Sequence, residues 1–197
     1  MTPSPQVPAT PPAKKPFPVV LIVVIVAVAM CCPVTGILAA IAIPNFIKYQ
    51  SRAKQIECKS NLRVAFAAEE AYRAEKDAYD TDANKVGFTP RNNRYVYLFS
   101  KSGTPETIVE AAHPEKKVSA SQALAAVRGI NGLGLEGECP ACEITIACVG
   151  NIDNDDDLDV WSISSAEREI GDEMVPAGSP YQHQDDLGLK GRHRRGE

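Results

Sequence analysis

The chain has 197 residues, enough for one domain of ordinary size and some extra segments but hardly for two domains. Its 21 basic and 25 acidic residues give a formal net charge of −4, which argues against a nucleic-acid-binding protein, because such proteins usually present a basic face. The hydrophobic residues are concentrated in an uncharged run of 25 positions, 19–43, which is not expected of a purely soluble enzyme.

The segment before the apolar run is rich in proline. Residues 1–18 contain seven of the 15 prolines in the chain. Such a segment has little to bury, so we expect a disordered or polyproline II head at 1–18.

The apolar run predicts a single-pass transmembrane helix at 19–44. Twenty-five helical residues measure about 37 Å, against about 30 Å for the hydrocarbon core of a bilayer. A buried core helix would show a polar face and a signal peptide has a shorter apolar region, so both alternatives fit less well. The flanking charges do not decide the orientation, because basic residues lie on both sides of the run. They are Lys14, Lys15, Lys48, Arg52, Lys54 and Lys59.

Residues 45–82 have the three- and four-residue spacing of an amphipathic helix. Its apolar face consists of Cys58, Leu62, Ala65, Phe66, Ala68, Tyr72 and Tyr79. Its charged residues lie largely off that face, as Lys59, Arg63, Glu70, Arg73 and Lys76 do. Pro44 removes a backbone donor and is expected to bend or loosen the helix where the apolar run ends.

The remaining chain changes to strand and loop signals. Within 83–141, aromatic and β-branched residues predict a strand at 94–100, and a short helix is expected at 119–128 with Ser119 or Ser121 as its N-cap. Residues 142–166 predict a β-hairpin around a polar loop. The basic tail at 187–197 has no core-forming residues and is expected to be flexible. The fold class is therefore α+β.

In the hairpin, alternation assigns the apolar side chains to faces. In 143–149, one face of the strand carries Ile144, Ile146 and Cys148. In 160–165, Trp161 and Ile163 share a face.

Three segments of this sequence resemble type IV pilins and pseudopilins. GILAAIAIPNFI at 36–47, followed by the basic stretch KYQSRAK, resembles their N-terminal helix, and the likeness continues through SNLRVAFAAEEAYRAEKDAY at 60–79. GNIDNDDDLDVWSI at 150–163 is similar to the final hairpin of many bacterial pilins. The resemblance implies a lollipop: a long helix whose second half packs on a small antiparallel sheet.

The resemblance also implies a location and partners. It places a single-pass protein in the bacterial inner membrane, in contact with lipid, with the C-terminal domain in the periplasm or outside the cell. The helix would pack around Gly36 and Pro44 against other pilin or pseudopilin subunits, and the protein would meet a pilus or secretion assembly machinery. No nucleic-acid partner is expected.

The N-terminal region departs from the family pattern. Family members are cut after a Gly that precedes Phe-Thr-Leu-Ile-Glu. An ungapped alignment anchored on Gly36 and Pro44 puts the cut after Ile22 and the family's glutamate position at Ala27. An alignment anchored on residues 14–17 instead puts Leu21 at the glutamate position. Neither alignment supplies the Gly or an acid, so we expect the span to stay uncleaved and the head to remain attached. Cys31 and Cys32 are a possible lipidation or dimer site, although small apolar helix residues are the simpler interpretation.

The hairpin loop is strongly acidic. It holds Asp153, Asp155, Asp156, Asp157 and Asp159. Carboxylates this close repel one another, and a hard dication bound by oxygen ligands would relieve the repulsion. We therefore predict a structural Ca²⁺ site formed by Asp153, Asp155, Asp157 and Asp159. The alternative is a solvated turn whose Asn and Asp residues tolerate left-handed backbone.

Four cysteines lie outside the apolar run, an even number that suits an oxidising compartment. The CxxC spacing of Cys139 and Cys142 is compatible with zinc or thiol redox chemistry, but no matching second pair exists and the motif precedes a strand. A strand over 142–148 keeps its ends about 20 Å apart, too far for a disulfide. Cys139 lies within about 10 Å of Cys142, so it could reach Cys148 only by a complete chain reversal. We therefore predict the pairs Cys58–Cys148 and Cys139–Cys142.

No catalytic set is apparent in the sequence. His113, His183 and His193 lie in loop or tail segments, and no glycine-rich phosphate loop follows a strand. We therefore expect a non-enzymatic, structural subunit of a type IV pilus or a type II secretion pseudopilus. The alternative function is a membrane-tethered binding or sensing module that keeps the pilin fold and does not polymerise.

Overall fold

A computed structural model describes residues 19–114 and 116–187, with the side chains of 30–34 left out. The predicted head at 1–18 and nearly all of the predicted tail lie outside the described residues, as do the expectations for the side chains of Cys31 and Cys32. The chain divides into two compact units, Met1–Phe46 and Ile47–Glu197.

In the first unit, the described residues form the beginning of helix α1 (Val19–Lys76), which continues through Pro44 without a break. The helix exposes large apolar side chains here, including Ile37, which is 64% exposed. A Cβ on Gly36 would meet no atom within 4 Å. Within the described part of the chain, we find no helix that combines the length and the apolar character needed to cross a membrane. The predicted span at 19–44 therefore stays a prediction.

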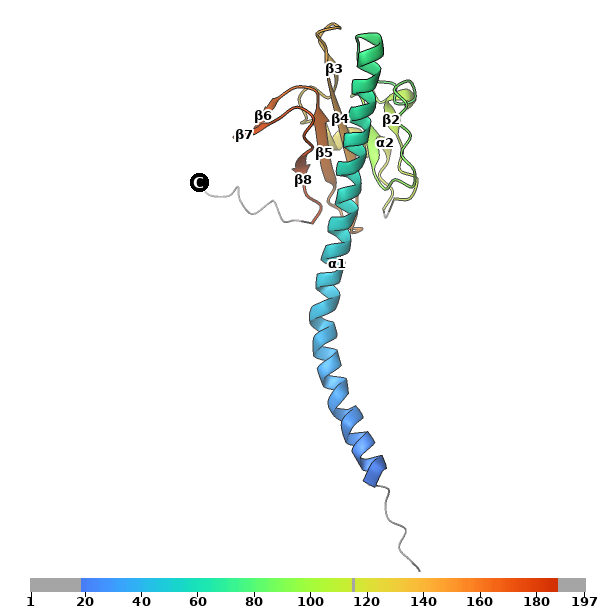
Figure 1. Cartoon of the computed structure of the whole chain (residues 1–197), viewed down its shortest axis with the longest axis vertical. Helices are drawn as coiled ribbons and strands as arrows, with labels where there is room; N and C mark the ends of the chain where they lie inside the picture. The colour runs from blue at the N-terminus through green and yellow to red at the C-terminus, as the bar shows by residue number, and fades with distance from the viewer. Residues whose placement is uncertain (1–18, 115, 188–197) are drawn as a thin grey trace, which may run out of the picture. The chain divides into compact units, whose positions relative to one another are not determined.

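The second unit is a helix packed on an antiparallel sheet, as the α+β prediction requires (Figure 1). The sheet order is β2-β1-β4-β5-β8, and β3 also pairs with β4. A separate two-stranded sheet joins β6 and β7. The strands are β1 (Val96–Leu98), β2 (Ile108–Val109), β3 (Gly134–Glu136), β4 (Glu143–Gly150), β5 (Asp159–Ser164), β6 (Arg168–Ile170), β7 (Glu173–Val175) and β8 (Tyr181–Gln184).

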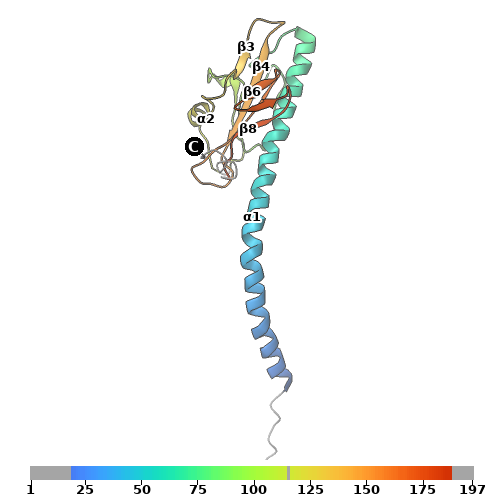
Figure 2. The same cartoon turned by 90° about the vertical axis from the view of Figure 1, so that its left-hand side faces the viewer.

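The two faces of the sheet carry separate hydrophobic clusters. In Figure 2, α1 lies on one side of the sheet and α2 (Ala120–Ala126) on the other. The α1 side buries Cys58, Leu62, Ala65, Tyr95, Tyr97, Ile144, Ile146, Cys148, Trp161 and Ile163. The α2 side buries Val96, Leu98, Ala123, Val127, Ala147, Val149 and Val160. The alternation predicted for both hairpin strands is therefore confirmed.

Both helices lie where they were predicted, but each is shorter than predicted. Helix α1 ends at Lys76 rather than near residue 82, because Asp77 adopts a left-handed conformation (φ 53°) that terminates the helix. Helix α2 starts after Ser119, whose side chain accepts a hydrogen bond from the Gln122 N–H in a capping box.

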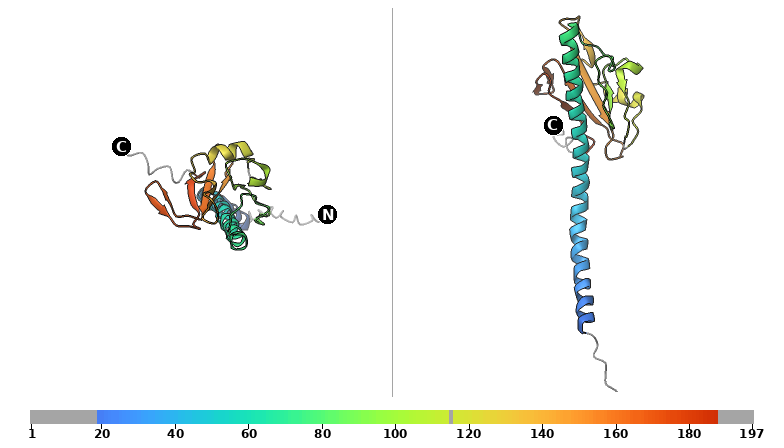
Figure 3. Two further views of the ribbon diagram at one scale, coloured as in Figure 1. Left: turned by 90° about the horizontal axis from the view of Figure 1, so that it is seen from above. Right: turned by 45° about the vertical axis from the view of Figure 1, so that its right-hand side comes forward.

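Short strands at the edges were not predicted. The predicted strand at 94–100 is only Val96–Leu98, and strands β2, β3, β6, β7 and β8 carry no periodic signal of their own. Seen from above in Figure 3, the β6–β7 hairpin extends sideways from the main sheet. Each of these strands has two to four residues, too few for a period of two to stand out.

Two disulfides are present, and they join the pairs that the sequence predicts. Cys58–Cys148 connects α1 to the central strand β4, with 6.5 Å between the Cα atoms. Both residues are fully buried. Cys139–Cys142 closes a short loop just before β4.

The two disulfides are expected to contribute unequally to stability. Cys58–Cys148 spans 90 positions and Cys139–Cys142 spans three, so chain entropy predicts about 4.5 kcal/mol for the first and about 2 kcal/mol for the second. The double variant C58S/C148S should therefore lose more stability in urea unfolding than the matched variant C139S/C142S. Equal losses would contradict this ranking.

Candidate functional site

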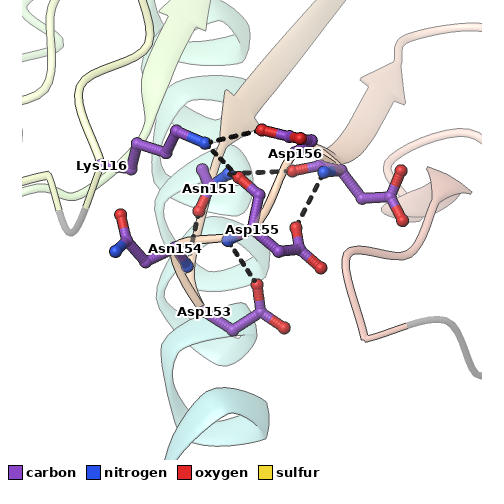
Figure 4. A network of polar contacts seen from close by, with 7 residues as sticks. Lys116, Asn151, Asp153, Asn154, Asp155 and Asp156 are labelled. Carbon is purple, nitrogen blue, oxygen red and sulfur yellow. Dashed lines mark hydrogen bonds and ion pairs between the residues drawn. The ribbon is translucent and has the colours of Figure 1, made fainter.

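The acidic loop between β4 and β5 is folded around one buried amide. Asn151 is 2% exposed. Its Nδ2 donates to the carbonyl oxygens of Asp155 (2.8 Å) and Asp157 (3.0 Å), and its Oδ1 accepts from the N–H of Asn154 (2.8 Å). Figure 4 shows these contacts converging on Asn151. Asn154 has a φ of 70°, so the predicted tolerance for left-handed backbone is used at this position.

Two lysines from distant segments reach this loop. The sequence contains no Lys or Arg between Arg128 and Arg168. In the folded unit, the Lys116 amino group contacts the Asp156 carboxylate (3.1 Å) and the carbonyl oxygen of Asp155. Lys54 on α1 donates to the carbonyl of Ile152 (2.9 Å). Part of the charge that the sequence leaves unbalanced is thus compensated through tertiary contacts.

Two of the four predicted metal ligands lie together, and a third carboxylate joins them. Ligand atoms of Asp153, Asp155 and Asp186 all lie within 4.8 Å of one another. Asp186 follows β8 and is 2% exposed. Burial raises the pKa of Asp186 to about 7, the carboxylates of Asp153 and Asp155 add to the rise, and the hydrogen bond from the Ile152 N–H opposes it. Nothing in the sequence pointed to Asp186, which is 27 positions beyond the loop.

The other two predicted ligands lie elsewhere. The Asp157 side chain is exposed and outside the group. Asp159 is fully buried, because it begins β5 with its side chain on the α1 side. Its carboxylate accepts hydrogen bonds from Tyr95 Oη (2.7 Å), Trp161 Nε1 (2.8 Å), Gln182 Nε2 (2.9 Å) and Gln55 Nε2 (3.2 Å). With four donors around it, Asp159 is an internal acceptor and not a ligand of the loop.

The structure also brings together a serine and a histidine that the sequence analysis did not connect. Ser162 Oγ lies 2.7 Å from His183 Nε2, and Arg168 Nη1 donates to the same oxygen (3.0 Å). An open pocket of about 450 Å³ is lined by Arg168 and His183, together with residues 129–132, 166–171 and residues of β3 and β4. Ser162 is fully buried and does not line this pocket, so its hydroxyl is not presented to a substrate.

Comparison with known proteins is decisive for the family. Residues 49–121 match the family described as Type IV pilin PilA. The chain is also 31% identical to the Type IV major pilin protein PilA of Myxococcus xanthus (strain DK1622) over 218 aligned positions, which cover 91% of this chain and 96% of that protein. The chain belongs to the type IV pilin family. The resemblance inferred from residues 36–79 and 150–163 is thereby confirmed, and the family is one of structural proteins.

A second buried carboxyl group of this pilin lies on α1. Glu69 is fully buried, although the spacing of apolar residues gave no sign of it. Its Oε2 accepts a hydrogen bond from the Asp80 N–H (3.3 Å), and Oε1 has no donor among the described residues. Burial raises the pKa of Glu69 to about 8, a rise that the Asp80 N–H opposes and the Asp80 carboxylate reinforces. A carboxyl group with this pKa is mostly protonated at pH 7.

Substitution of Asp159 should destabilise this pilin strongly. Asp159→Asn replaces one acceptor oxygen by an NH₂ group that faces other donors, so we expect a loss of about 2–4 kcal/mol in urea unfolding. Asp157→Asn is the matched control, since the same change on an exposed side chain should cost less than about 0.5 kcal/mol. Similar effects of the two variants would refute the internal role of Asp159.

Glu69 should make stability depend on pH. The unfolded chain ionises this group near pH 4.5 and the folded protein near pH 8, so its favourable contribution is complete below pH 4.5 and is lost as pH rises to 8. Relative to Glu69→Gln, the free energy of unfolding of the unmodified pilin should fall as pH rises from 5 to 7.5. The slope should approach, and not exceed, about 1.4 kcal/mol per pH unit. Urea unfolding at several pH values measures this difference.

The control for this measurement is Glu75→Gln, which changes an exposed carboxylate on the same helix. Its stability should run parallel to that of the unmodified pilin across the same pH range. A parallel course for Glu69→Gln as well would show that Glu69 ionises normally in the folded protein.

Proposed function

We propose that this pilin is a structural, non-enzymatic subunit of a bacterial type IV pilus. The observation that carries the proposal is the match over 91% of the chain to a protein named as a type IV major pilin. A type II secretion pseudopilus subunit and a non-polymerising tethered module are the alternatives, and the test below separates them.

The first part of α1 supports this assignment. Side chains such as Val20, Ile25, Ile37 and Leu38 are each more than half exposed in the single chain. So much contiguous apolar surface is unusual for a soluble monomer. We propose that it contacts lipid of the inner membrane before assembly and the same helix of neighbouring copies afterwards, with the second unit on the periplasmic or outer side.

The second unit fits exposure outside the cytoplasm. Its two disulfides require an oxidising compartment to form and persist. Cys58–Cys148 joins the sheet to the helix that would be held in the filament, so the sheet would stay packed on that helix under load.

Deletion of the gene for this chain tests the proposal directly. We expect surface filaments to disappear from the sheared fraction and to return on complementation, with the chain recovered in them. Filaments that persist while protein secretion fails would identify a pseudopilus subunit. A chain found only in the membrane fraction would identify the tethered module.

A charge in the apolar part of α1 should block assembly. Ile37→Lys places an ammonium group among apolar side chains, at a cost of about 3 kcal/mol at the centre of a membrane helix. The variant should be absent from sheared filaments and should keep the melting temperature of the second unit, whereas the control Ile37→Val should assemble normally. Normal assembly of Ile37→Lys would contradict the proposed contacts.

A further inference from the structure

The carboxylates of Asp153, Asp155 and Asp186 form a compact oxygen group in the second unit. Their ligand atoms lie within 4.8 Å of one another. Opposite oxygens around a Ca²⁺ ion are about 5 Å apart, because Ca–O distances are 2.3–2.6 Å, whereas those around Mg²⁺ are only about 4.1 Å apart. Three oxygens within 4.8 Å of one another can all contact one Ca²⁺ ion.

Asp186 carries the argument beyond a cluster of surface acids. The residue is 2% exposed, and its Oδ2 accepts a hydrogen bond from the Ile152 N–H at 2.6 Å. Its Oδ1 is buried and has no hydrogen-bond donor among the described residues. A buried carboxylate oxygen without a donor is costly unless the group is protonated or a cation lies against it. Its neighbours here are two more carboxylates, and one divalent cation would neutralise charge on all three groups at once.

The loop geometry leaves one carboxylate oxygen each of Asp153 and Asp155 available to a cation. Asp153 and Asp155 each use Oδ1 to accept a main-chain N–H within the loop, from Asp155 and Asp157 respectively. Lys116 contacts Asp156 and a carbonyl oxygen and does not bind the carboxylates of the group. No His or Cys belongs to the group, so the donor set consists of oxygens only, as hard cations prefer.

We propose that Asp153, Asp155 and Asp186 bind a structural Ca²⁺ ion that fastens the β4–β5 loop to the segment after β8. Three carboxylates supply the charge, and water and loop carbonyls complete the six to eight oxygen ligands that Ca²⁺ takes. This ligand set replaces the one predicted from the sequence, since Asp186 takes the place of Asp157 and Asp159. The site does not depend on assembly into a filament.

Calorimetric titration of the full chain in detergent, with CaCl₂ after treatment with a chelator, tests the proposal. We expect one saturable site per chain and a rise in melting temperature of about 5–10 °C at a hundredfold excess over Kd. MgCl₂ at the same concentration should give a clearly smaller rise. The absence of a response up to about 10 mM Ca²⁺, or an equal response to Mg²⁺, would overturn the proposal.

Three variants identify the ligands. Asp186→Asn and Asp155→Asn should each weaken Ca²⁺ binding at least about tenfold. Asp157→Asn is the matched control in the same loop and should bind as tightly as the unmodified chain. Loss of binding in Asp157→Asn with retention in Asp186→Asn would overturn the assignment in favour of the loop carboxylates alone.

Asp186→Asn should remain folded, which keeps the comparison meaningful. Asparagine retains an oxygen for the Ile152 N–H and removes the buried charge, so the melting temperature without Ca²⁺ should not fall. If it falls by as much as the Ca²⁺-induced rise and the response to Ca²⁺ persists, Asp186 acts only in packing and the proposal fails. Asp155 is exposed, so Asp155→Asn tests Ca²⁺ binding with a substitution that does not disturb the hydrophobic core.

Discussion

The packing of α1 against the central strand β4 is the constraint on which the rest of the second unit depends. Cys148 lies between Tyr97 and Trp161 on neighbouring strands, and its disulfide to Cys58 fixes the helix over this point. Lys59 follows Cys58 on the helix, and its amino group lies over the Trp161 ring, 4.3 Å from the ring centroid. Because a helix and a strand joined covalently cannot slide, side chains one turn away along α1 reach fixed partners in the hairpin.

The hairpin loop shows how that constraint assigns different roles to similar residues. On the helix, Gln55 lies close enough to donate to Asp159, and Lys54 to donate to the Ile152 carbonyl. Asp159 is thus enclosed by donors at the start of β5, while Asp153 stays at the surface. The side chains are identical, and the difference in environment comes from where the strand begins.

Asp186 reaches the loop because β8 pairs with β5. Val160 lies opposite Gln184 in this antiparallel pair, so the residues after β8 pass beside the residues before β5. Two segments separated by more than 25 positions therefore contribute carboxylates to one group. The exposed apolar part of α1 lies in the other unit, so the features proposed for assembly and for ion binding belong to separate units of the chain.

The sequence by itself determined the elements whose signal is long and periodic: the helix that buries Cys58, Leu62 and Ala65, the hairpin that includes Ile144 and Ile146, and the family. It also predicted the disulfide pairs, since strand length excluded Cys142–Cys148 and Cys139 could reach Cys148 only by a chain reversal. Only the tertiary structure decided the short edge strands, the burial of Glu69 and Asp159, and the arrival of Asp186 and Lys116 at the loop. The physical reason is that periodicity reports which face of an element is apolar, whereas the environment of a polar side chain depends on segments that are distant in sequence and become its neighbours only on folding.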